Sequence, residues 1–173
     1  MENKVLVAYA STNGSTQEIA EAIAATLGEN GVTVDLQPMR KVRTLQGYRA
    51  VVLGAPLYIL HWHKDALRFL SRQRQALLNM PVAIFASGPS FKGDEEECKE
   101  VNRQVKQELA KFPWLAPVAV EIMGGRFDPH KLRFPLNLIP ALKHMPASDL
   151  RDWTAIRSWA SSLPAILQPA APA

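Results

Sequence analysis

The segment 6-LVAYASTNGSTQEIAEAI-23 decides the fold, because it passes from an apolar run into a helical pattern through a short polar loop. The apolar run stops at Ser11, and Ser11–Thr16 holds four hydroxyl residues and one glycine but no lysine or arginine. Ile19 and Ile23 then stand four residues apart, the spacing of one face of a helix. The segment therefore predicts a buried strand, a specialised loop and a helix.

Apolar runs and helical patterns alternate along the rest of the chain. Strands are predicted at Lys4–Tyr9, Val32–Leu36, Ala50–Gly54, Val82–Ala86 and Val118–Met123. Helices are predicted at Ser15–Leu27, Lys64–Leu78, Asp94–Lys111 and Leu150–Leu163, the last capped by Ser148 or Asp149. This alternation favours an α/β fold, a doubly wound parallel sheet of five strands with helices on both faces. We expect one domain over residues 1–163, with an insertion at about 124–147 and a disordered Pro/Ala-rich tail at 164–173.

Composition and charge limit the class of protein. The 173 residues include one cysteine, so an internal disulfide is impossible. Neither a signal-peptide pattern nor an apolar run long enough to span a bilayer is present, which predicts a cytoplasmic protein. The net charge of +4 suits an acidic partner or an anionic membrane surface, and equally ordinary surface charge. No Lys/Arg run is interleaved with aromatic residues, so nucleic acid is not an expected partner.

The loop after the first strand has the composition of an anion site. Ligands of such sheets bind beyond the carboxyl ends of the strands, where a helix N-terminus presents free N–H groups. The loop lacks the Lys-Ser/Thr end of a Walker A motif and is not GxGxxG, so a phosphate monoester held by neutral donors is the favoured ligand. The alternative is a capped helix start without a ligand. The donors would be Ser11, Thr12, Asn13, Ser15 and Thr16, with Gly14 allowing close approach of the backbone.

This loop resembles the phosphate loop of the flavodoxin family, written T-x-T-G-x-T. Ser11, Gly14 and Thr16 fit that pattern, whereas Asn13 replaces the usual threonine. The resemblance implies a sheet of order 2-1-3-4-5 that binds FMN.

Two further segments resemble the family's loops around the flavin ring. They are 51-VVLGAPLYILHWHKDALRFL-70, after the third strand, and 83-AIFASGPSF-91, after the fourth. The resemblance implies that Tyr58, Trp62 or Phe91 stacks on the ring, although these side chains could instead pack on the next helix. The implied cofactor-binding residues of these loops are Pro56, Leu57, Tyr58, Ile59, Ser87, Gly88 and Pro89.

Within the family, the chain resembles the menaquinone-dependent protoporphyrinogen oxidase type. The matching later segments are 124-GGRFDPHKLRFPLNLI-139 and 151-RDW-153. This resemblance implies an oxidoreductase whose redox partners are a quinone and a porphyrinogen, with no side chain assigned a catalytic role. An electron-carrying flavodoxin that docks on proteins, and a module of this fold without cofactor, are the alternatives.

The segment Phe127–Met145 is apolar and basic. It suits an anionic membrane interface, which would place the protein at the inner face of the membrane, or an apolar substrate. Packing on the domain's own core is the alternative, and Pro135 and Pro140 argue against one smooth amphipathic helix.

His61 and His63 are separated by one residue, so an extended backbone would point them the same way. A metal pair is conceivable, but no third ligand is evident and we expect no metal. A histidine near a flavin could instead donate a hydrogen bond or a proton, or play no part.

Overall fold

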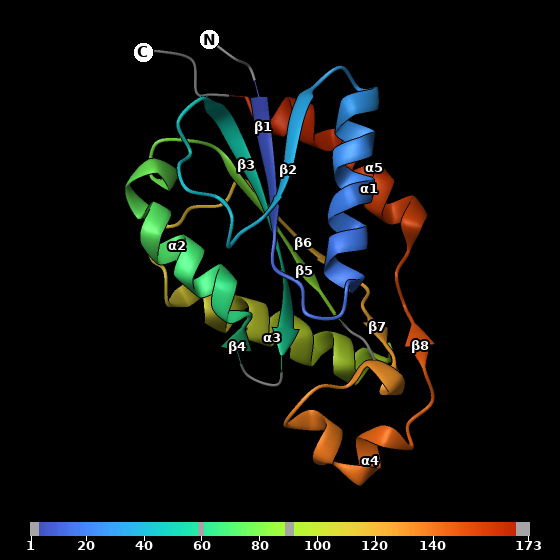
Figure 1. The fold of residues 1–173 in the computed structure, drawn as a ribbon. Coiled ribbons are helices and arrows are strands. Elements are labelled where there is room, and N and C mark those ends of the chain that lie inside the picture. The colour runs from blue at the N-terminus through green and yellow to red at the C-terminus, as the bar shows by residue number, and fades with distance from the viewer. Residues whose placement is uncertain (1–3, 59–60, 89–91, 169–173) are drawn as a thin grey trace.

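The computed structural model describes residues 4–58, 61–88 and 92–168, and its centre is a twisted parallel sheet (Figure 1). The strand order is β2-β1-β3-β5-β6, with a two-residue strand, β4 (His61–Trp62), antiparallel to the end of β3. The predicted five-stranded sheet of order 2-1-3-4-5 is confirmed. The fourth and fifth predicted strands are labelled β5 and β6 only because the short β4 precedes them in the chain. The parallel strands are β1 (Lys4–Tyr9), β2 (Thr33–Pro38), β3 (Tyr48–Tyr58), β5 (Val82–Ser87) and β6 (Ala119–Met123).

Helices cover both faces of the sheet, as expected. In Figure 1, α1 (Ser15–Glu29) and α5 (Trp153–Ile166) lie on one side, and α2 (Lys64–Leu77) and α3 (Glu95–Ala110) on the other. Ile19, Ile23 and Leu163 are fully buried on the first side, and Phe69 and Leu70 are buried on the second. Strands buried on both faces are continuous apolar runs, which explains why β1 has no polar alternation.

Strand β3 runs four residues beyond Gly54, where the sequence placed its end. Gly54 pairs with Phe85 of β5, and the Phe85 ring lies over it. A Cβ on Gly54 would stand 1.9 Å from Phe85 Cζ. The glycine therefore makes room for a core ring inside the sheet and does not end the strand.

The last helix begins later than predicted and has a different cap. The Asp152 carboxylate accepts the N–H of Ala155 at 2.9 Å and caps α5. Ser148 and Asp149, the predicted caps, instead form β8 (Ser148–Asp149), which pairs antiparallel with β7 (Arg126–Phe127).

The prediction that the tail from residue 164 is disordered is wrong for residues 164–167. Helix α5 continues through Pro164 to Ile166, and Leu167 is fully buried. Leu163 and Leu167 lie four residues apart and both pack in the core on the α1 side, so burial holds this last turn in place. Residues 169–173 lie outside the described part of the chain.

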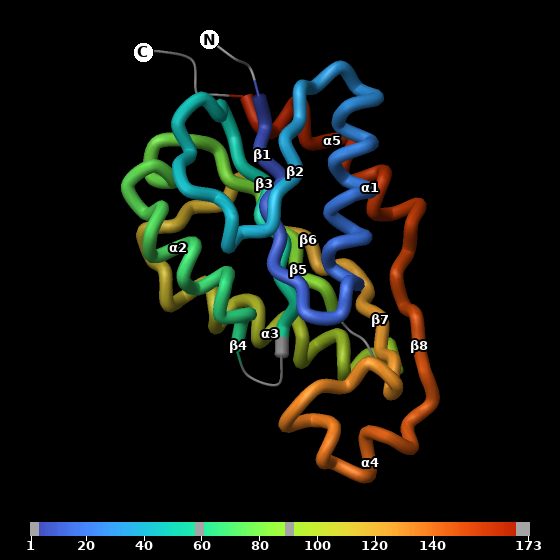
Figure 2. The backbone as a smooth tube through the Cα atoms, viewed as in Figure 1, coloured from blue at the N-terminus to red at the C-terminus, as the bar shows by residue number. Residues whose placement is uncertain are grey.

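The insertion at 124–147 forms a small lobe beyond the carboxyl ends of the strands, below the sheet in Figures 1 and 2. No regular structure is predicted for this stretch from its sequence, and only short elements occur in it. No helix among the described residues is both long and apolar enough to cross a bilayer. The elements of the lobe are β7, two 3-10 turns, η1 (Pro129–Lys131) and η2 (Leu136–Leu138), and α4 (Pro140–Lys143), before β8 returns the chain to α5.

Candidate functional site

The loop between β1 and α1 is held in one shape by its glycine. Gly14 has a φ of +87°, a left-handed conformation that side chains with a Cβ rarely adopt. The Gly14 N–H donates to Ser11 Oγ at 3.0 Å, and the Gly14 carbonyl accepts the N–H of Glu18 at 3.0 Å. The turn therefore leads directly into the first turn of α1, whose N–H groups point toward the loop.

The hydroxyls of this loop have different surroundings. Thr16 Oγ1 and Ser87 Oγ, both buried, are 2.8 Å apart and join the loop to the end of β5. Thr12 Oγ1 lies 3.0 Å from His63 Nε2. Ser15 Oγ is buried and has no hydrogen-bond partner among the described residues. An unpaired buried hydroxyl is unfavourable by about 1–3 kcal/mol, so Ser15 is a group that a polar ligand would satisfy.

These hydroxyls line a cavity of about 360 Å³ at the carboxyl end of the sheet. Its volume lies within the range of roughly 300–1,000 Å³ that is usual for small-molecule sites. The structure brings together residues from all three loops predicted from the sequence. The predicted residues that line the cavity are Ser11, Thr12, Asn13, Ser15, Thr16, Pro56, Leu57, Ser87 and Gly88.

The remaining predicted residues have other places. Gly14 shapes the loop without lining the cavity, and Tyr58 is the last residue of β3. Ile59 and Pro89 lie outside the described residues, as does Phe91. Trp62 is buried in the core beneath α2 and does not line the cavity, as the packing alternative expected.

Helix α3 supplies a wall that sequence reasoning missed. Glu97, Glu100, Val101 and Gln104 line the cavity. Their spacing of i, i+3, i+4 and i+7 marks one face of a helix, and this signal was available in the sequence. The Arg103 guanidinium hydrogen-bonds Glu100 and lowers the pKa of that carboxyl to about 2, so Glu100 is ionised at the cavity rim.

The insertion supplies the apolar wall. Phe127, Leu132, Leu136 and Leu142 line the same cavity as the loop Ser11–Thr16, which we call the hydroxyl loop, together with Gly125 and Arg126. The sequence left open whether this segment contacts an apolar substrate or packs on its own domain. In the structure, its apolar side chains lie at the cavity. One cavity is thus lined both by hydroxyls of the loop and by hydrocarbon side chains of the insertion.

An ion network joins the base of the insertion to α1. Arg126 Nη2 lies 3.3 Å from Glu18 Oε1, and the Arg151 guanidinium contacts both Glu18 and Asp149. Only 4% of the Arg151 side chain is exposed, and its guanidinium lies 4.7 Å from the centre of the Trp153 ring. Hydrogen bonds from Arg151 hold the pKa of Glu18 and of Asp149 below their usual values. Both carboxylates are thus ionised at neutral pH and fix the insertion beside the hydroxyl loop.

The two histidines have different surroundings. His61 is exposed, with Nδ1 3.8 Å from Glu108 Oε1, whereas His63 is buried and caps the N-terminus of α2. Across residues 4–58, 61–88 and 92–168, no group of three His, Cys, Asp or Glu side chains is arranged to hold a metal ion.

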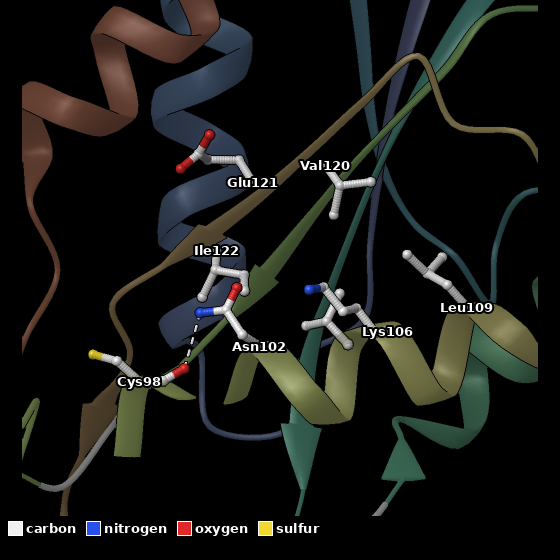
Figure 3. Close-up of a pocket in the computed structure, with 8 residues that line it drawn as sticks. Cys98, Asn102, Lys106, Leu109, Val120, Glu121 and Ile122 are labelled. Atoms are coloured by element: carbon white, nitrogen blue, oxygen red, sulfur yellow. Dashed lines mark hydrogen bonds between the residues drawn. The ribbon is translucent and has the colours of Figure 1, made fainter. Parts of the chain in front are cut away.

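A second hollow, of about 560 Å³, lies between α3 and the edge strand β6 (Figure 3). Its lining mixes Val105, Leu109 and Val120 with Lys106 and Glu121. It is larger than the first cavity, but it is formed by one helix and one strand away from the predicted loops. The smaller cavity is the better candidate because three strand ends and the insertion meet there.

Comparison with known proteins agrees with this geometry. The model of the Flavodoxin domain family matches residues 6–139. Protoporphyrinogen IX dehydrogenase [quinone] of Escherichia coli (strain K12) is 25% identical over 134 residues, which cover 76% of this chain and 71% of that protein. The protein of the same name from Leishmania major is 23% identical over 174 residues, covering 94% and 75%.

Solved structures share the fold. Oxidised flavodoxin 1 from Bacillus cereus superimposes with a TM-score of 0.60 at 15% identity, covering 96% of this chain and all of that one. Rubredoxin oxygen:oxidoreductase from Desulfovibrio gigas gives 0.53 at 20% identity, covering 98% of this chain and 37% of that one. The family match spans most of the chain and includes the hydroxyl loop, so the chain belongs to the Flavodoxin domain family.

Proposed function

We propose that the chain binds FMN non-covalently and acts as an oxidoreductase of the quinone-linked protoporphyrinogen oxidase type. The observation that carries this proposal is that one cavity is lined both by the hydroxyl loop and by apolar side chains of the insertion. The flavin cofactor and redox class are those of the family, and the substrate pair comes from the relatives' names.

The residues present fit FMN. The unpaired Ser15 hydroxyl and the N–H groups of the first α1 turn would hold the phosphate. Pro56, Leu57 and Gly88 would hold the ring, because they lie at or next to the ends of β3 and β5, the two strands beside the loop. Bound FMN would supply the redox chemistry, in which a reduced substrate loses hydrogen and a quinone gains it to become a quinol. The chain's own part is to orient that cofactor and to exclude water with the insertion's leucines.

An absorption spectrum followed by titration with FMN and riboflavin tests the cofactor. We expect flavin bands and much tighter binding of FMN than of riboflavin, which lacks the phosphate. Equal affinity for both would contradict the phosphate site, and no affinity for either would leave a module of this fold without cofactor.

Anaerobic oxidation of protoporphyrinogen IX with a menaquinone analogue tests the reaction. We expect porphyrin to appear only when the protein and the quinone are both present. A flavin-loaded protein that fails this test but exchanges electrons with protein partners would instead be a carrier.

We also propose that the outer face of the insertion contacts an anionic membrane, where the quinone is dissolved. The Phe134 side chain is 77% exposed and Leu138 is 65% exposed, and the exposed cations Arg133 and Lys143 flank them. Residues 129–147 contain no acid. Each such apolar side chain gains about 1.5–3 kcal/mol when fully buried, and the cations add a salt-sensitive attraction to anionic lipid.

Sedimentation with vesicles tests this contact. Wild type should bind phosphatidylglycerol-containing vesicles and not pure phosphatidylcholine, and high salt should weaken the binding. The pair Phe134→Ser and Leu138→Ser should abolish binding, whereas Val118→Ser, an exposed apolar residue away from the lobe, should not. Equal binding by both sets of variants would contradict the proposal.

A further inference from the structure

His63 joins the start of α2 to the hydroxyl loop through its two ring nitrogens. Nδ1 accepts the backbone N–H of Asp65 at 3.1 Å and so caps the helix. Nε2 lies 3.0 Å from Thr12 Oγ1. The residue is only 8% exposed, so neither contact is a transient surface contact.

The cap fixes which nitrogen carries the proton. Burial lowers the pKa of His63, while the Asp65 carboxylate opposes this and Lys64 and Arg40 add to it. The ring is therefore neutral at neutral pH. Because Nδ1 is already an acceptor, the ring proton is on Nε2, and this N–H donates to Thr12 Oγ1.

The direction of that bond determines what Thr12 can offer. A hydroxyl oxygen that accepts a hydrogen bond still has its own hydrogen to donate. Thr12 lines the cavity, so its hydrogen is available to an acceptor there. Ser11 is arranged in the same way, since its oxygen accepts the Gly14 N–H at 3.0 Å. Both hydroxyls thus accept from the protein and are left to donate to the ligand.

We infer that His63 is a positioning residue of the anion site, which orients the Thr12 hydroxyl as a hydrogen-bond donor to the phosphate of the bound cofactor. The inference rests on the proposed FMN site and adds a residue outside the loop to it. Its consequence is selectivity, because a hydroxyl whose hydrogen is directed into the cavity favours a ligand group that accepts hydrogen bonds, such as a phosphate oxygen.

His63→Asn separates this role from the cap. Asparagine is a good N-cap, so the start of α2 is kept, but its side chain is too short to reach Thr12. Thr12→Val removes the hydroxyl itself. His61→Asn is the matched control, because His61 is exposed and faces Glu108 instead of the loop.

The readouts are dissociation constants for FMN and riboflavin, measured by quenching of flavin fluorescence on the apoprotein. We expect His63→Asn to weaken FMN binding by about 3- to 10-fold and Thr12→Val by at least as much, the worth of one hydrogen bond. Riboflavin affinity and the apoprotein Tm should not change in His63→Asn. The double variant should bind FMN with the same affinity as Thr12→Val alone, because both substitutions remove the same interaction.

Three results would overturn the inference: unchanged FMN affinity in His63→Asn, equal losses for FMN and riboflavin, or additive losses in the double variant. These leave the proposed function intact, provided that wild type binds FMN. Wild type that binds no FMN would overturn both.

Discussion

Replacing Ser15 with alanine should make the apoprotein more stable and FMN binding weaker. The Ser15 hydroxyl is buried at the cavity and unpaired among the described residues. A polar group that forms its hydrogen bond only with a bound ligand destabilises the free protein and stabilises the complex. Opposite signs for the two effects are therefore the signature of a binding group.

The expected magnitudes follow from this environment. Removing an unsatisfied buried hydroxyl relieves about 1–3 kcal/mol, of which we take about 1.5 kcal/mol for Ser15. At about 2–4 °C per kcal/mol for a chain of this size, the apoprotein Tm should rise by about 3–6 °C. A hydrogen bond to a charged phosphate contributes about 1.5–3 kcal/mol, so FMN affinity should fall by about 10- to 150-fold.

Thermal unfolding of the apoprotein and fluorescence titration with FMN measure the two effects. Ser158→Ala is the control, because Ser158 is exposed within α5 and reports helix propensity alone. A fall in the apoprotein Tm of Ser15→Ala would show that the hydroxyl serves the folded chain. An unchanged FMN affinity would show that Ser15 does not face the ligand, and either result would refute the reasoning.

Two other perturbations test the scaffold of the site. Gly54→Ala should destabilise the protein by about 1–3 kcal/mol, because its Cβ would stand 1.9 Å from the buried Phe85 ring, and Phe85→Leu in the same chain should recover part of the loss in urea unfolding. The stability that Glu18 and Asp149 contribute is present above their ordinary pKa values and should be lost as the pH falls below about 4.5, because Arg151 lowers both pKa values. Arg151→Leu should flatten this acid limb in unfolding curves measured from pH 7 to pH 3, and an unchanged slope would contradict the assignment.

The features that the sequence predicted best are local ones. Every buried strand is a continuous apolar run, and the hydroxyl loop is contiguous, so neither requires knowledge of distant contacts. Gly54 shows the limit of this approach. A glycine after an apolar run resembles a strand end, but here it makes room for Phe85, which lies 31 positions away and cannot be paired with it without the register of the sheet.

The walls of the cavity were harder to predict because they depend on topology. The α3 face has a detectable helical spacing, but nothing in the chain says that this face meets the hydroxyl loop. Arg126 and Arg151 likewise converge on Glu18 from more than 100 residues away, and the antiparallel pairing of β7 with β8 brings them together. Such contacts follow from the fold and not from local pattern.

The insertion distinguishes the proposed enzyme from an electron carrier. A carrier needs an open flavin edge for a protein partner, whereas Leu132, Leu136 and Leu142 add a hydrocarbon wall to this cavity. Packing of the insertion on its own domain explains the leucines that line the cavity. It does not explain why Phe134 and Leu138 are exposed. A segment with one apolar face toward the cavity and another toward the outside suits an apolar substrate that reaches the site from a membrane. That requirement is met by a quinone acceptor, and it is why the two proposals about this lobe support each other.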